Sequence, residues 1–124
     1  MTFNFKTLIA DDDPDMRNLL RDFLEELGCT VDIEVENGRD ALKHLGIIQP
    51  DIAFIDIEMP VKTGLEVLQE IKEISPKTKP IIVSGHNTIA NVKSALALGA
   101  KGFVVKPYEI DKIKQILEKF KSTN

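Results

Sequence analysis

The chain has 124 residues, of which 43% are hydrophobic and 29% charged, a composition that excludes intrinsic disorder and indicates one globular core. Its formal net charge of −4 at pH 7 argues against nucleic-acid binding by this chain, because a phosphate backbone demands a basic surface. Cys29 is the only cysteine, which excludes a disulfide framework and a cysteine-rich metal site. The opening segment MTFNFKTLIA is too short for a membrane span and lacks a cleavage-site pattern, so we expect a cytoplasmic protein that contacts no membrane.

The first predicted elements are a strand and the helix that follows it. Residues 5–10 form a mainly apolar run that ends abruptly at Asp11-Asp12-Asp13-Pro14. The next segment is expected to be a helix with Asp13 as its N-cap, Pro14 in its first turn and Gly28 as its terminator. Apolar residues recur along it at helical spacing: Met16, Leu19, Leu20, Phe23, Leu24 and Leu27.

Four more pairs of a strand and a helix follow in the same order. Strands are expected at residues 30–35, 52–55, 81–83 and 103–105, with the first of these near a sheet edge because it is the most polar. Helices are expected after Asn37-Gly38, over residues 64–74, after a cap at Asn87 or Thr88, and along the apolar stripe of residues 110–120. The apolar residues assigned to the third helix are Leu65, Leu68 and Ile71, and those assigned to the fourth are Ile89, Val92, Ala95 and Leu96.

Strict alternation of strands and helices indicates a five-stranded parallel sheet with helices on both faces, which is the doubly wound (βα)₅ α/β fold. We expect residues 1–124 to form this single domain, with no effector domain in this chain. In open sheets of this kind, ligands bind in the crevice at the carboxyl ends of the strands. The residues that follow each predicted strand are therefore the candidates for a functional site.

Four of the five predicted strands end in a polar residue that carries a carboxylate, a hydroxyl or an ammonium group. The first strand ends in Asp11 and Asp12, the third in Asp56, the fourth in Ser84 and the fifth in Lys106. Because the carboxyl ends of parallel strands meet at one edge of the sheet, we expect these side chains to converge.

A metal ion explains this convergence better than helix capping does. Capping accounts for Asp13, but not for Asp56, which lies between apolar neighbours on a different strand. Three nearby carboxylates repel one another unless a cation joins them. Oxygen-only ligands, without paired His or Cys, favour Mg²⁺ (or Mn²⁺) over Zn²⁺. A carboxylate beside such a cation, with a lysine and a hydroxyl nearby, suits phosphoryl transfer in which Asp56 attacks phosphorus in line.

The sequence resembles a response-regulator receiver domain, the module that receives phosphate in two-component signalling. The segments LIADDDPDMR, FIDIEMPVKTG, IIVSGHN and GAKGFVVKPY carry this resemblance, and their order and spacing match over essentially the whole chain. The resemblance implies a flavodoxin-like sheet with strand order 2-1-3-4-5. It also implies a sensor histidine kinase or histidine phosphotransfer domain as phosphoryl donor. A downstream target protein or a missing effector domain would be the second partner, and it would bind the surface formed by the fourth helix, the fifth strand and the fifth helix.

The resemblance also implies individual roles at the site. Asp56 matches the phosphoacceptor, and Asp11 and Asp12 match the acidic pair that holds Mg²⁺ together with the backbone carbonyl of Glu58. Lys106 matches the lysine that contacts the phosphoryl group, and its bond to the following proline is cis in the family.

Four positions are implied to tune or transmit the signal. Ser84 stands where the family has a Ser or Thr whose side chain hydrogen-bonds a phosphoryl oxygen. Phe103 stands at the aromatic position that turns inward when this hydroxyl residue moves toward the phosphate. A plain core aromatic is an equal alternative for Phe103. Glu58 and His86 occupy the positions that tune phosphate lifetime, with an exposed loop histidine as the plainer interpretation of His86. Such a domain catalyses only its own phosphorylation and dephosphorylation.

Two other classes share some of these features. An aspartate-nucleophile phosphatase of the haloacid-dehalogenase type also places an aspartate after a buried strand, but its second acid is Asp, whereas Glu58 stands here and the chain lacks room for a cap domain. A flavodoxin-like FMN binder would need a hydroxyl- and glycine-rich first loop, whereas Asp11-Asp12-Asp13 would repel the FMN phosphate.

Many DNA-binding response regulators carry acidic residues just before the last strand and use them in a symmetric dimer. Lys101 and Gly102 stand at that place here, which argues against this dimer.

Overall fold

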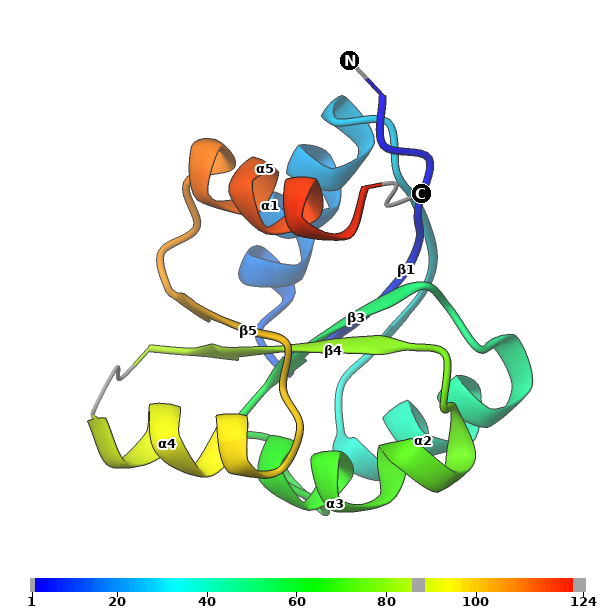
Figure 1. The fold of residues 1–124 in the computed structure, drawn as a ribbon, viewed down its shortest axis with the longest axis vertical. Coiled ribbons are helices and arrows are strands. Elements are labelled where there is room, and N and C mark those ends of the chain that lie inside the picture. The colour runs from blue at the N-terminus through cyan, green and yellow to red at the C-terminus, as the bar shows by residue number, and fades with distance from the viewer. Residues whose placement is uncertain (1, 86–88, 122–124) are drawn as a thin grey trace.

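The computed structural model describes residues 2–85 and 89–121. Strands and helices alternate along the chain (Figure 1). The strands are β1 (Lys6–Ala10), β2 (Thr30–Val35), β3 (Ile52–Asp56), β4 (Lys79–Ser84) and β5 (Gly102–Val105). The helices are α1 (Pro14–Glu26), α2 (Gly38–Ile48), α3 (Gly64–Ile74), α4 (Ile89–Ala97) and α5 (Ile110–Phe120).

The five strands form one parallel sheet in the order β2-β1-β3-β4-β5, which confirms the expected fold and places the polar strand β2 at an edge. Helices α1 and α5 cover one face of the sheet, and α2, α3 and α4 cover the other (Figure 1). Strand β3 lies at the centre, and all five of its residues are buried. The carboxyl ends of β1 and β3, which pair directly, therefore meet at one edge of the sheet.

Each face of the sheet has its own hydrophobic core. Leu8, Ala53 and Ile55 face the α2–α4 side, whereas Ile9 and Phe54 face the α1–α5 side. This alternation follows from the two-residue period of a strand, which sends successive side chains to opposite faces. Because both faces are covered, the central strand β3 is buried along its whole length, and Asp56 at its end is a buried charged group among apolar neighbours.

Local side-chain chemistry fixes the ends of the helices. The Asp13 carboxylate accepts hydrogen bonds from the backbone N–H groups of Asp15 and Met16, which confirms it as the N-cap of α1. Gly28 follows α1 with φ of +91°, a conformation that glycine adopts without strain. Thr63 and Glu66 form a reciprocal capping box at the start of α3.

The structure differs from the expected apolar faces in two helices. In α3, Val67 is fully buried while Leu65 is only half-buried. In α4, Ala95 is fully buried and Leu96 is 53% exposed, so the smaller residue is the one that packs on the sheet. The expected cap of α4 at Asn87 or Thr88 lies outside the described residues. Within the described ranges, no helix is long and apolar enough to cross a membrane.

Candidate functional site

Three carboxylates converge where β1 and β3 end. Asp11, Asp12 and Asp56 each offer one oxygen, and these oxygens all lie within 4.8 Å of one another. Asp11 and Asp56 are almost fully buried, at 1% and 3% exposure, whereas Asp12 is exposed at the rim. The structure thus brings together the three acids that the sequence predicts to converge, with one side open to solvent.

Lys106 joins the two buried acids. Its Nζ atom lies 2.8 Å from Asp56 Oδ2 and 2.9 Å from Asp11 Oδ2, so one ammonium bridges two carboxylates. Burial would lower the pKa of Lys106, but its pairing with Asp11 and Asp56 outweighs that effect and raises it. The Lys106–Pro107 peptide bond is cis, as the family resemblance implies.

The charge of the site is only partly balanced. Burial raises the pKa of Asp56 from 3.8 to about 6; hydrogen bonds from Lys106 and from the Glu58 N–H oppose this rise, and the charge of Asp11 adds to it. Asp11 Oδ2 is buried and pairs with the Lys106 ammonium, and no second hydrogen-bond donor reaches it from the described residues. A buried carboxylate oxygen with one partner, within a set of oxygen ligands only, is the arrangement that a hard divalent cation fits.

The backbone after β3 is packed closely around Asp56. The N–H of Glu58 donates to Asp56 Oδ1 at 3.1 Å. A Cβ atom on Gly64 would lie only 2.4 Å from the Asp56 carbonyl oxygen, so this position requires glycine. Between them, Val61 has φ of +70° and is 65% exposed, and the Lys62 N–H donates to the Pro60 carbonyl across it. A β-branched residue rarely adopts this conformation, so the loop stores strain beside the site.

The other predicted site residues that the structure describes lie at the end of β4, within β5 and directly after β3. Ser84 is fully buried and pairs in register with Val105, and its carbonyl accepts a hydrogen bond from the Lys106 N–H at 2.9 Å. Phe103 is half-buried and packs against the core on the α2–α4 side. Glu58 is exposed next to Asp56, whereas His86 lies outside the described residues.

Sequence reasoning assigned no role to two residues that the structure places near the acids. Tyr108 is buried, and burial together with the charges of Asp11 and Asp56 raises its pKa above the ordinary value. The sequence feature that could have pointed to Tyr108 as a site neighbour is its position directly after Lys106-Pro107. Arg17, on the first turns of α1, donates from Nη1 to the Asp11 carbonyl oxygen at 2.7 Å. An arginine on an amphipathic helix carries no sequence signal that would separate it from a solvent-facing one.

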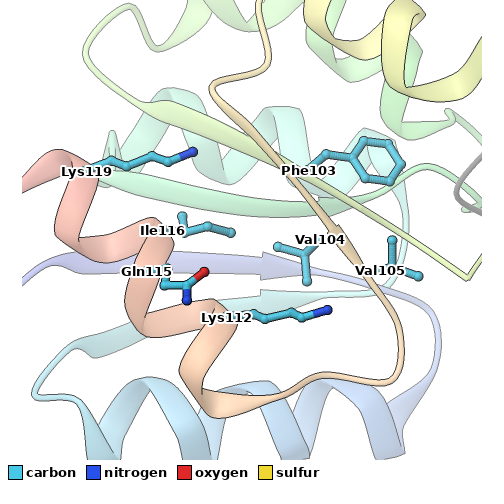
Figure 2. Close-up of a pocket in the computed structure, with 7 residues that line it drawn as sticks. All are labelled: Phe103, Val104, Val105, Lys112, Gln115, Ile116 and Lys119. Carbon is cyan, nitrogen blue, oxygen red and sulfur yellow. The ribbon is translucent and has the colours of Figure 1, made fainter. Parts of the chain in front are cut away.

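A pocket of about 260 Å³ lies between β5 and α5. Figure 2 shows the Phe103 ring directed away from α5, while Val104 and the lysines of α5 line the other side. The pocket is lined by Phe103, Val104, Val105, Lys112, Gln115, Ile116 and Lys119. The lining thus combines two lysines and one glutamine of α5 with apolar side chains of β5 and α5.

Comparisons with known proteins identify relatives and solved structures that this chain resembles. The chain is 37% identical to the chemotaxis protein CheY of Thermotoga maritima over 114 residues, covering 92% of this chain and 95% of that protein. It is 38% identical to CheY of Listeria monocytogenes, covering 92% and 96%. Its fold matches a chain in the CheX–CheY–BeF₃–Mg²⁺ complex of Borrelia burgdorferi with a TM-score of 0.89 and 28% identity, covering 94% of this chain and 88% of that one. Residues 7–118 match the response regulator receiver domain, and the chain therefore belongs to this family of two-component signalling domains.

Proposed function

We propose that this protein is a phosphoacceptor switch in which Asp56 receives a phosphoryl group from the histidine of a sensor kinase or a phosphotransfer domain. The observation that carries the proposal is the convergence of the Asp11, Asp12 and Asp56 oxygens within 4.8 Å, with Lys106 bridging the two buried acids. Phosphoryl transfer requires little of a protein beyond a positioned nucleophile and positive charge around the transferring oxygens, and this set supplies both.

The donor set fits Mg²⁺ or Mn²⁺. Asp11, Asp12 and Asp56 would hold the ion with their carboxylates, and Glu58 would contribute its backbone carbonyl. When bound, the ion supplies positive charge that offsets the negative charge on the phosphoryl oxygens. The exposed side of Asp12 leaves room for water ligands, which Mg²⁺ usually retains.

The proposed reaction forms one bond and breaks another. A carboxylate oxygen of Asp56 bonds to phosphorus while the phosphorus–nitrogen bond of the donor phosphohistidine breaks, and the leaving imidazole keeps the electron pair and takes a proton. Lys106, now 2.8 Å from Asp56 Oδ2, turns to the new phosphoryl oxygens, and the Ser84 hydroxyl donates to them. Water later hydrolyses the aspartyl phosphate, with Glu58 and His86 setting the lifetime. The protein thus catalyses only its own phosphorylation and dephosphorylation.

The proposed readout is a change in the α4–β5–α5 surface. Ser84 lies beside Val105 in the sheet, so its movement toward the phosphoryl group acts directly on β5. Phe103 would turn inward into the space that Ser84 leaves, and the pocket between β5 and α5 would change with it. A downstream target protein in the cytoplasm would read this change.

Intact-protein mass tests the proposal most directly. The protein is incubated with acetyl phosphate and Mg²⁺, beside a sample in EDTA and an Asp56→Asn variant. We expect a single phosphoryl adduct that requires Mg²⁺ and is absent from the variant. Folded wild-type protein that gains no adduct, or an adduct that persists in Asp56→Asn, would contradict the assignment of Asp56.

A further inference from the structure

Arg17 connects the acidic site to the edge of the sheet. Its Nη1 atom donates to the Asp11 carbonyl oxygen at 2.7 Å, and its Nε atom lies 3.5 Å from Glu34 Oε1 on β2. Glu34 is held in turn by Arg21, whose Nη1 atom lies 2.8 Å from Glu34 Oε2. The Arg17 side chain is only 16% exposed, so it is a packed part of the fold and not a freely moving surface group.

The carbonyl that Arg17 holds belongs to the peptide group that joins Asp11 to Asp12. A peptide group is planar, so fixing its oxygen fixes the direction in which the chain leaves Asp11 and enters Asp12. The N–H of Asp11 is already held by the Val35 carbonyl at 3.0 Å, and the Asp13 N–H donates to Asp11 Oδ1 at 2.9 Å. Arg17 therefore supplies the contact that orients the two acids relative to each other.

Resting on the proposed function, we infer that Arg17 is a positioning residue for the Mg²⁺ site, held in place by Glu34. Groups that orient metal ligands without touching the metal commonly change metal affinity by about 10–100-fold when they are removed. We expect the lower end of this range, about tenfold weaker Mg²⁺ binding, because Asp11 keeps its other backbone contacts.

Charge alone predicts the opposite sign. Removing a positive side chain near the site lowers the repulsion that an incoming dication meets, so a purely electrostatic role for Arg17 would make Mg²⁺ bind more tightly in its absence. A lysine in its place would keep the charge but lose the planar fork that lets arginine contact the carbonyl and Glu34 together. A positioning role predicts weaker Mg²⁺ binding in both Arg17→Met and Arg17→Lys. A purely electrostatic role predicts tighter Mg²⁺ binding in Arg17→Met and no change in Arg17→Lys.

The experiment measures Mg²⁺ affinity in wild type, Arg17→Met, Arg17→Lys and Glu34→Gln. Affinity is taken from the rise in unfolding free energy with Mg²⁺ concentration and, independently, from the fluorescence of Tyr108, the only tyrosine in a chain without tryptophan. We expect dissociation constants about tenfold higher for both Arg17 variants and a smaller rise for Glu34→Gln.

Arg21→Met is the matched control. It removes a shorter ion pair with the same Glu34 but no contact to Asp11, so its Mg²⁺ affinity should stay within about twofold of wild type even if its stability falls. Equal or tighter binding by Arg17→Met, or an equal loss in Arg21→Met, would overturn the inference. Wild-type protein that binds no Mg²⁺ would overturn the proposed metal site itself, which separates the two failures.

Discussion

The buried carboxylate of Asp56 should destabilise the folded protein whenever no cation is bound, so replacing it by asparagine is expected to raise stability. Asp56 is only 3% exposed, and burial raises its pKa from 3.8 to about 6. At roughly 1.4 kcal/mol for each pKa unit, this rise corresponds to about 3 kcal/mol of lost stability at neutral pH. The Asp56→Asn change leaves Lys106 its pair with Asp11 at 2.9 Å, so no unpaired buried ammonium offsets the gain.

The sign of the effect sets its pH dependence. A carboxyl group with a higher pKa in the folded state penalises folding wherever it is ionised in both states, which is above about pH 6. The penalty fades as pH falls toward 3.8, where the group is protonated in both states. The stability advantage of Asp56→Asn is therefore largest at pH 7.5, falls to about half at pH 5, and disappears in stronger acid.

Urea unfolding in EDTA at about pH 7.5 and about pH 5 measures this difference, because the extrapolated free energies of unfolding can be compared directly. Asp12→Asn is the control, since it removes a carboxylate from the same cluster that is exposed to water, and it should gain less than about 1 kcal/mol. An Asp56→Asn variant that is no more stable than wild type, or whose advantage does not shrink on acidification, would refute the reasoning.

Three further changes test the packing around the site by urea unfolding. Val61→Asn should stabilise the protein by about 1 kcal/mol, because asparagine tolerates the positive φ that strains valine; a loss of stability would argue against strain there. Gly64→Ala should cost about 1–3 kcal/mol and slow labelling by acetyl phosphate, since its Cβ would meet the Asp56 carbonyl; unchanged labelling would contradict this. Phe54→Ala should cost about 3–5 kcal/mol, and a much smaller loss would mean that the core collapses around the cavity.

The elements that the sequence predicts best are those whose ends depend on local chemistry. Asp13, Pro14 and Gly28 bound α1 as expected, because capping and backbone conformation are properties of the residues themselves. Strand β4 begins earlier than expected, at Lys79, because pairing with β3 extends the ladder through Pro80. A proline near the start of a strand looks like a boundary in sequence, whereas its position in the sheet depends on the neighbouring strand.

The burial of residues on α4 could not be predicted from its pattern. Ala95 and Leu96 are adjacent and both apolar, so helical periodicity allows either to face the sheet. In the structure Ala95 packs into the core on this face of the sheet, and Leu96 is left 53% exposed. Which of two adjacent apolar residues packs is a tertiary property that no local pattern contains.

The same distinction applies to the candidate site. The convergence of Asp11, Asp12 and Asp56 follows from topology alone, because parallel strands end at one edge, and the structure brings the three together as expected. Other contacts of the site depend on side-chain directions that packing sets. These are the ion pairs of Lys106 with Asp11 and Asp56 and the hydrogen bond from Arg17 to the Asp11 carbonyl. Sequence thus predicts which groups meet, while the structure is needed to say which of them hold the others in place.

The position of Lys106 gives a physical reason for coupling the site to the α4–β5–α5 surface. Its side chain forms an ion pair with Asp56, while its backbone N–H donates to the Ser84 carbonyl at the end of β4. In the proposed switch, the two groups that must rearrange around a phosphoryl oxygen, Lys106 and Ser84, are therefore joined at one junction. Val104 and Val105 precede that junction and line the pocket against α5, so a shift of the junction reaches the pocket through only two residues of β5. A short rigid strand transmits a small displacement better than a flexible loop would, because packed elements move between discrete arrangements.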